Sequence, residues 1–261
     1  MNMQRSTKKL LNDCGILIYN FPSHIDYTSI AQRCVAQCKT HLPDIPIMSV
    51  GNPIAGADQH YDMDNPQHNK RVFGNQSKTW HNLARHLAFD VSPWYRTVVI
   101  DCDYMVMSDQ LHKLFASDQQ IMMHRQWYDI TNDTVETISV GKSAIDMMWA
   151  TVLKFDRTDE VQQFFDLWQR VIANYSYYAK LFSFSPHVIR NDFAVSIALK
   201  QLVNFGSVDH CVIPWNIHTT RDSVEVKSID TNKITFTDTK SDFDVAFDCH
   251  VLNKESLADA C

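Results

Sequence analysis

The sequence predicts an α/β fold in which a mixed, mostly parallel sheet is flanked by helices. Three observations predict it. Short apolar, β-prone runs alternate with stretches of helical period, as in β-α-β units. The apolar runs do not alternate with polar residues, which is typical of strands buried on both faces. No linker rich in Pro, Gly and Ser divides the 261 residues, so one domain over residues 1–261 is expected.

The first unit is the clearest. Residues 15–20 (GILIYN) are apolar and β-prone and predict a buried strand. Apolar residues recur at helical spacing over 26–42, and Pro43 ends that helix. Residues 45–53 predict a second short strand, stopped by Gly and Pro. The polar stretch 51–77 has the composition of a long loop.

The middle of the chain continues this alternation. The expected elements are a helix over 77–93, a strand over 95–101, a short helix near 110–116, a strand over 120–124, a loop over 128–146 and a strand over 147–155.

The last third starts with helices. We expect one over 158–182, because Thr158 and a nearby Glu160 form a sound helix start. A second helix is expected over 191–203. Residues 223–239 alternate in polarity on both sides of DTNK and predict a β-hairpin near the C-terminus. Residues 247–257 have no strong period.

Composition limits the function classes. The chain is 45% apolar and 21% charged, which is ordinary for a globular protein. It has no run of about 18 apolar residues and therefore no expected membrane span. Its N-terminus lacks the pattern of a signal peptide. Seven scattered cysteines without a CxxC pair fit a reducing cytoplasm. The net charge of −6 gives no support to non-specific nucleic-acid binding.

Several catalytic signatures are missing from the sequence. It has no G-x-G-x-x-G for a dinucleotide, no G-x-S-x-G for an α/β-hydrolase and no HExxH. The GKS in VGKSA (140–144) lacks the upstream Gly of a phosphate loop, since that position is Glu136.

The stretch VVIDCDYMV (98–106) carries the strongest chemical signal. Asp101 and Asp103 stand at the end of an expected buried strand, with no Lys or Arg beside them. In an extended chain, side chains two residues apart point the same way. Ligands bind at the carboxyl ends of strands in open α/β sheets, and paired carboxylates suit Mg²⁺ or Mn²⁺. The alternative is a solvent-exposed strand end with two acidic residues.

The context of this motif resembles GT-A glycosyltransferases, especially the glycogenin-like group, and is similar to glycosyltransferases encoded by large tailed phages. The resemblance rests on Trp80, Asn82, Arg85, Ser92, Pro93 and the D-x-D of Asp101-Cys102-Asp103 before Tyr104. It implies the GT-A (Rossmann-like) fold. It also implies that Asp101 and Asp103 hold Mn²⁺ or Mg²⁺ on the diphosphate of a nucleotide-sugar, with Arg85 facing this donor.

Two downstream segments fit the same resemblance. It implies that Asp192, in RNDFAVSIAL (190–199), lies near the reacting sugar carbon and that Asn191 contacts the donor. The alternative for Asp192 is a carboxylate favoured by the helix dipole. In DCHVLNK (248–254), the resemblance makes His250 the third metal ligand and Lys254 a diphosphate contact.

The chain departs from the family pattern at two places. Cys102 stands in the middle of a motif that often reads DAD in the family. The tail also lacks the G..KPW segment that follows the histidine in the glycogenin-like group, which puts the role of Lys254 in doubt.

Substrate contacts are expected at two further places. GT-A proteins usually bind the donor at the end of the first strand, here Tyr19, Asn20 and Phe21, and Asn20 is suited to a uracil or ribose. The alternative is a strand that simply ends in a Pro turn. Trp127 and Tyr128, in an expected loop, are candidates to stack on an acceptor; otherwise they belong to the core.

The resemblance therefore implies a metal-dependent glycosyltransferase with a nucleotide-sugar donor, preferably a UDP-sugar. The phage likeness suggests a hydroxylated base in phage DNA as acceptor and the host cytoplasm as location. Residues 68–71 (HNKR), with Lys78 and Arg85, are the local basic cluster for DNA. A protein, glycan or small-molecule acceptor stays open.

Two rival functions also stay open. The first is a GT-A-like binding or assembly module that has lost its chemistry. The second is a nucleotidyltransferase, whose usual Gly-rich phosphate loop is not seen in YNFPSH (19–24). The oligomeric state is not readable from the sequence.

Overall fold

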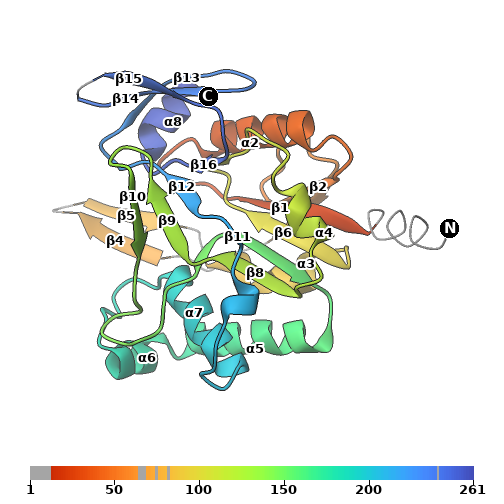
Figure 1. Cartoon of the computed structure of the whole chain (residues 1–261), viewed down its shortest axis with the longest axis vertical. Coiled ribbons are helices and arrows are strands. Elements are labelled where there is room, and N and C mark those ends of the chain that lie inside the picture. The colour runs from red at the N-terminus through yellow and green to blue at the C-terminus, as the bar shows by residue number, and fades with distance from the viewer. Residues whose placement is uncertain (1–12, 64–68, 74–75, 81–82, 240) are drawn as a thin grey trace.

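The computed structural model of the chain describes residues 13–63, 69–73, 76–80, 83–239 and 241–261 (Figure 1). For residues 69–73 and 76–80 it describes the backbone and not the side chains.

A six-stranded sheet forms the centre of the fold, in the order β3-β2-β1-β6-β11-β8. Its strands are β1 (Cys14–Asn20), β2 (Ile47–Gly51), β3 (Gln59–Tyr61), β6 (Arg96–Ile100), β8 (Ile121–His124) and β11 (Trp149–Asp156). β1 runs parallel to β2 and β6, and β2 runs parallel to β3. β11 is antiparallel to both of its neighbours. The predicted mixed, mostly parallel sheet is confirmed.

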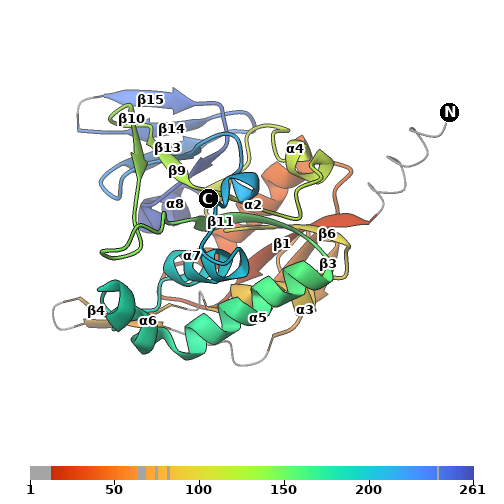
Figure 2. The same ribbon diagram turned by 60° about the horizontal axis from the view of Figure 1, so that its bottom comes forward.

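Helices cover both faces of this sheet (Figures 1 and 2). α2 (Tyr27–His41) lies on one face, and α5 (Asp159–Ala173) and α7 (Asn191–Leu202) lie on the other. The side chains of β1 show why helices are needed on both faces. Ile16 and Ile18 belong to the core that includes α2, whereas Leu17 belongs to the core of α5 and α7. Successive strand residues point to opposite faces, so an uninterrupted apolar strand requires apolar cover on each.

The helix starts follow the sequence closely, but one predicted helix is broken. Asp26 caps α2 by accepting from the backbone N–H groups of Thr28 and Ser29 at 3.1 Å. Thr158 caps α5 in the same way. The single helix predicted over 158–182 is wrong, because α5 ends at Ala173 and α6 (Tyr175–Phe182) follows after Asn174. The backbone of Asn174 leaves the helical region, with φ −114° and ψ 29°.

A second sheet has five strands, in the order β10-β9-β12-β16-β7. Its strands are β7 (Tyr104–Met105), β9 (Gln126–Asp129), β10 (Thr134–Thr137), β12 (Ile217–Thr219) and β16 (Cys249–His250). The loop predicted over 128–146 is therefore wrong in its first part, since β9 and β10 pair antiparallel there. β10 is exposed along its whole length, so no apolar run marks it in the sequence.

The C-terminal part contains the predicted β-hairpin and more. β13 (Glu225–Ile229) and β14 (Ile234–Thr237) pair antiparallel, as expected, and β15 (Asp242–Val245) adds a third strand. The tail without a period contains β16 and the short helix α8 (Lys254–Ala260). A two-residue strand and a helix of seven residues are too short to establish a period.

The helix predicted over 77–93 is wrong in its first half. β5 (Gln76–Trp80) pairs with β4 (Asn69–Phe73) as an antiparallel ribbon, inside the segments predicted as loop and helix. Among the described residues of this segment, only the short 3-10 helix η1 (Ala84–Leu87) and α3 (Ala88–Val91) are helical. Two further short helices are α4 (His112–Ala116), which was predicted, and η2 (Asp209–Cys211). In the described residues, no helix has the length and apolar character that crossing a membrane requires.

Candidate metal site

The two aspartates lie in a turn at the carboxyl end of β6. The strand ends at Ile100, and the backbone N–H of Tyr104 then donates to the carbonyl of Asp101 at 3.0 Å. The expectation that Asp101 and Asp103 share one side of an extended chain is therefore wrong, because the strand has already ended. The turn nevertheless brings both carboxylates to one pocket beside the end of β1.

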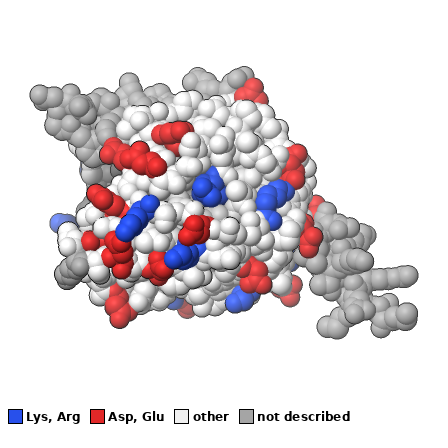
Figure 3. Space-filling model, turned by 90° about the horizontal axis from the view of Figure 1, so that it is seen from above, with Lys and Arg blue, Asp and Glu red and all other residues white. Residues whose placement is uncertain are grey.

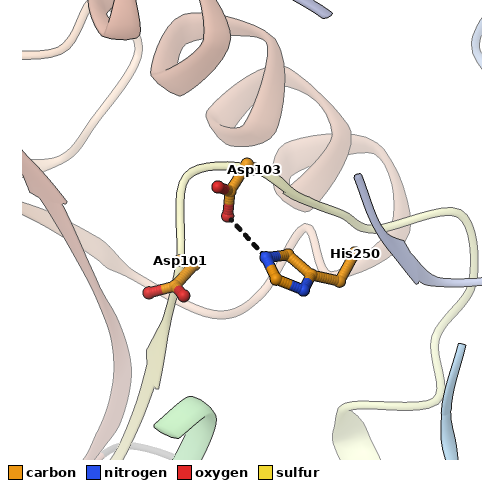
Figure 4. A group of neighbouring side chains, drawn as sticks. All are labelled: Asp101, Asp103 and His250. Carbon is orange, nitrogen blue, oxygen red and sulfur yellow. Dashed lines mark ion pairs between the residues drawn. The ribbon is translucent and has the colours of Figure 1, made fainter. Parts of the chain in front are cut away.

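A distant strand brings His250 to the same place. β16 pairs antiparallel with β7 and sets His250 opposite Tyr104. The backbone N–H of Val251 donates to the carbonyl of Asp103 at 3.0 Å. The Nε2 atom of His250 lies 3.3 Å from Oδ1 of Asp103 (Figure 4). One potential ligand atom from each of Asp101, Asp103 and His250 lies within 4.8 Å of the others.

Two cations complete the cluster. Arg85, on η1, forms an ion pair with Asp101, and Lys254, at the start of α8, forms one with Asp103. The Nζ atom of Lys254 also lies 3.3 Å from Nε2 of His250. These side chains are between 8% and 17% exposed, so the pairs are poorly screened by water. Each carboxylate thus has a cation of the chain itself beside it.

Burial and charge act differently on the two aspartates. Burial raises the pKa of Asp101 to about 7, although Arg85 opposes this rise. Burial would also raise the pKa of Asp103, but Lys254 and His250 outweigh it and hold that pKa well below its usual range. Burial and the charge of Lys254 lower the pKa of His250. A neutral imidazole, the form that binds metals, is therefore favoured at neutral pH.

The cluster lines a cavity of about 950 Å³, near the upper end of the usual size of ligand pockets. Asp192, in the first turn of α7, lines the same cavity and accepts from the backbone N–H of Ala150 at 3.0 Å. Its negative charge contributes to the raised pKa of Asp101. The structure thus brings Arg85, Asp101, Asp103, Asp192, His250 and Lys254 together around one cavity.

The residues predicted to contact a donor base are placed unequally. Tyr19 and Phe21 line the cavity. The Tyr19 hydroxyl is buried and makes no hydrogen bond to a described residue. Asn20 is 1% exposed and is not among the lining residues; both polar atoms of its side chain also have no partner among the described residues. Asn191 is buried at the start of α7 and lines the cavity.

The two aromatic residues predicted for an acceptor lie outside the cavity lining. Trp127 and Tyr128 are in strand β9 and not in a loop. The Trp127 ring packs 6.0 Å from that of Trp149, which does line the cavity, and the Tyr128 hydroxyl donates to Asp133. Of the other family-like residues, the Trp80 side chain and Asn82 lie outside the described residues.

Several lining residues were not predicted from the sequence, among them Tyr27, Trp149, Arg190 and Asp222. No local pattern could identify them, because their side chains meet the cavity through long-range packing.

The donor set fits a hard divalent cation. Two carboxylates and one imidazole supply oxygen and nitrogen ligands that can hold a divalent metal ion. The Nδ1 atom of His250 is buried, and no described residue hydrogen-bonds to it. Arg85 and Lys254 of the chain itself are paired with the two carboxylates, so a metal ion bound there would take the place of these cations.

Comparisons with known proteins gave only structural likenesses. No protein-family model matches the sequence, and no curated protein matches it. The glycosyltransferase GlyE of Streptococcus pneumoniae TIGR4 is similar over 77% of this chain and 45% of its own, with 15% identity and a TM-score of 0.42. The apo form of GlyE is similar over 72% of this chain and 43% of its own, with 13% identity and a TM-score of 0.44. The galactosyltransferase LgtC, solved with donor and acceptor sugar analogs, is similar over 70% of this chain and 69% of its own, with 12% identity and a TM-score of 0.43. The chain therefore spans less than half the length of the GlyE chains.

Proposed function

We propose that the protein is a metal-dependent glycosyltransferase of the GT-A type, which moves a sugar from a nucleoside-diphosphate donor to a hydroxyl acceptor. The observation that carries the proposal is the cluster of Asp101, Asp103 and His250, flanked by two cations in a cavity of about 950 Å³ at the carboxyl end of a mostly parallel sheet. We take residues 1–261 as one such domain, acting in the cytoplasm.

Each residue has a role in this proposal. A divalent ion held by Asp101, Asp103 and His250 would offset the negative charge that grows on the leaving diphosphate. Arg85 and Lys254, released from the carboxylates, would contact the diphosphate and add to that stabilisation. Asp192 would orient the donor sugar. Tyr19, Phe21 and Asn191 would contact the donor, and UDP is the nucleotide we favour. The buried amide of Asn20, which has no partner among the described residues, supports a role at the base or ribose.

The test is a thermal-shift panel of nucleoside diphosphates and nucleotide-sugars, with and without Mn²⁺. A ligand at a hundredfold excess over its Kd stabilises the folded state by about 2.7 kcal/mol. For a chain of this size, that corresponds to roughly 5 °C or more in Tm. We expect a Mn²⁺-dependent shift with one nucleotide in the wild type and none in Asp103→Ala.

Asp44→Ala is the matched control, since Asp44 is an exposed aspartate in the loop before β2. It should keep the full shift. Absence of any shift in the wild type would sink the proposal. Mn²⁺-dependent release of nucleoside diphosphate from the donor separates an enzyme from an inactive binding module. Consumption of a nucleoside triphosphate with release of pyrophosphate would instead indicate a nucleotidyltransferase.

For the acceptor, a hydroxylated base in phage DNA is one candidate. Such a substrate needs a basic path for its phosphates. On the face shown in Figure 3, Lys and Arg are interspersed with Asp and Glu and form no basic band. The side chains of the basic cluster at 68–71 and Lys78 lie outside the described residues. Salt-dependent binding of a duplex with 5-hydroxymethylcytosine, compared with the unmodified duplex, tests this candidate directly.

A further inference from the structure

Three cations among the described residues line the cavity, and they are not equivalent. Arg85 and Lys254 each form an ion pair with an aspartate of the metal site. Arg190, in contrast, has no carboxylate within 4.0 Å in the part of the chain that the structure describes. No described carboxylate therefore neutralises its charge at close range.

Neutral groups hold the Arg190 guanidinium in place. It lies over the ring of Phe193, with 4.3 Å between its central carbon and the ring centroid. One of its terminal nitrogens contacts the sulfur of Met147 at 3.5 Å. The backbone N–H of Arg190 donates to the Tyr175 hydroxyl at 2.9 Å, which fixes the residue at the start of α7. Stacking on an aromatic face orients the planar fork and leaves most of its N–H donors available.

The position of Arg190 in the cavity indicates which part of a bound ligand it would contact. It is two residues before Asp192, on the α7 wall of the cavity, whereas Tyr19 and Phe21 come from the end of β1. In the proposed reaction, β1 contacts the base and Asp192 orients the sugar. Arg190 therefore lies on the side where the sugar and the acceptor meet.

We propose that Arg190 is a specificity residue that binds an anionic substituent, a carboxylate or phosphate, on the sugar side of the substrate complex. The inference rests on the proposed glycosyltransferase function and names its substrate class, an acidic sugar. A guanidinium makes two parallel hydrogen bonds to a carboxylate or phosphate. The acidic group belongs either to the transferred sugar or to the acceptor, and the experiment separates these sources.

The first arm measures the affinity of UDP-glucuronate and UDP-glucose by calorimetry in the presence of Mn²⁺, with UDP as the reference ligand. If the acidic group is on the donor, wild type binds UDP-glucuronate about tenfold more tightly than UDP-glucose, which corresponds to about 1.4 kcal/mol. Arg190→Gln loses this preference, and Arg190→Lys, which keeps the charge but not the fork, retains part of it.

The second arm measures methyl glucuronide against methyl glucoside on the protein saturated with UDP and Mn²⁺. If the acidic group is on the acceptor, the tenfold preference appears in this arm and Arg190→Gln again removes it. The control is Arg157→Gln. Arg157 also lies over an aromatic ring, Phe89 at 5.3 Å, but it is not among the cavity-lining residues. This variant should behave as wild type in both arms.

Two failures are distinguishable. If UDP binds with Mn²⁺ but neither arm shows a preference for the acidic ligand, the assignment of Arg190 is overturned and the proposed function stands. If UDP does not bind at all, the proposed donor falls, and the second arm without nucleotide still decides whether Arg190 selects an acidic sugar. A preference that persists in Arg190→Gln also overturns the assignment.

Discussion

Replacement of Lys254 by Met should destabilise the protein in a way that Mn²⁺ reverses. The Lys254 ammonium and the Asp103 carboxylate form an ion pair whose side chains are 14% and 9% exposed. Removing one partner of a buried pair leaves the other charge uncompensated and costs about 3–5 kcal/mol. We expect about 3 kcal/mol here, because His250 remains 3.3 Å from the carboxylate.

The effect of the metal follows from the same geometry. In wild type an incoming cation must displace Lys254 from Asp103, whereas in Lys254→Met the carboxylate is free to bind it. We therefore expect the variant to bind Mn²⁺ at least tenfold more tightly. At saturating Mn²⁺ this adds about 1.4 kcal/mol to the stabilisation that wild type gains. Urea unfolding with and without Mn²⁺ measures both quantities.

Two further variants make this reasoning refutable. Asp103→Asn removes the carboxylate, so it should abolish most of the response to Mn²⁺. In the double variant Asp103→Asn/Lys254→Met, the second substitution should cost no more than about 1 kcal/mol, because no buried charge is left unpaired. Two results would contradict this reasoning. Either Lys254→Met alone lowers the free energy of unfolding by no more than about 1 kcal/mol, or Mn²⁺ stabilises this variant only as much as wild type. In both cases Lys254 and the metal do not compete for Asp103.

Three other substitutions test the surrounding structure. Asn20→Leu should raise the free energy of unfolding by about 1–3 kcal/mol, since it removes a buried amide that has no partner among the described residues, and should weaken nucleotide binding measured by calorimetry. A gain in stability without any loss of binding would remove Asn20 from the donor site. Burial lowers the pKa of His124 to about 3, so the unfolded state binds the extra proton below pH 6.5 and stability falls as the pH drops. His124→Phe should abolish about 2 kcal/mol of this loss between pH 7 and 5 in urea titrations, and an unchanged pH profile would refute the assignment. Gly15→Ala places a Cβ atom 2.3 Å from the ring of Trp94, and we expect thermal unfolding to show a loss of about 3 kcal/mol; a loss below about 1 kcal/mol would mean that the indole moves aside.

The strands of the central sheet could be predicted because their signal is local. β1 and β6 each contain three consecutive buried apolar residues, at 16–18 and 98–100, since helices cover both faces of these strands. β10 carries no such signal, because every residue in it is exposed and only its pairing with β9 defines it. The ribbon of β4 and β5 is likewise defined by its cross-strand pairing, and β5 occupies the start of the segment that was predicted as a helix.

The site was only partly predictable for a related reason. Asp101 and Asp103 are visible in the sequence because two acids follow an apolar run. His250 and Lys254 come about 150 residues later in the chain, and the pairing of β16 with β7 brings them back. No local property of their segment indicates this, and only the order of family-like motifs suggested it. Arg190 could not be singled out in the sequence, because what distinguishes it from Arg85 and Lys254 is that no described carboxylate pairs with it, and only the folded structure shows this.

The charge arrangement explains why two aspartates can end a buried strand. A buried carboxylate without a partner would be costly, and the chain supplies a cation for each, Arg85 for Asp101 and Lys254 for Asp103. Lys254 stands in the first turn of α8, where the helix dipole disfavours a positive charge. The position of Lys254 is therefore explained by its ion pair with Asp103 and not by the helix dipole. A divalent ion bound by the two carboxylates would release Arg85 and Lys254 into the cavity. That release would supply positive charge where the proposed reaction needs it, at the diphosphate.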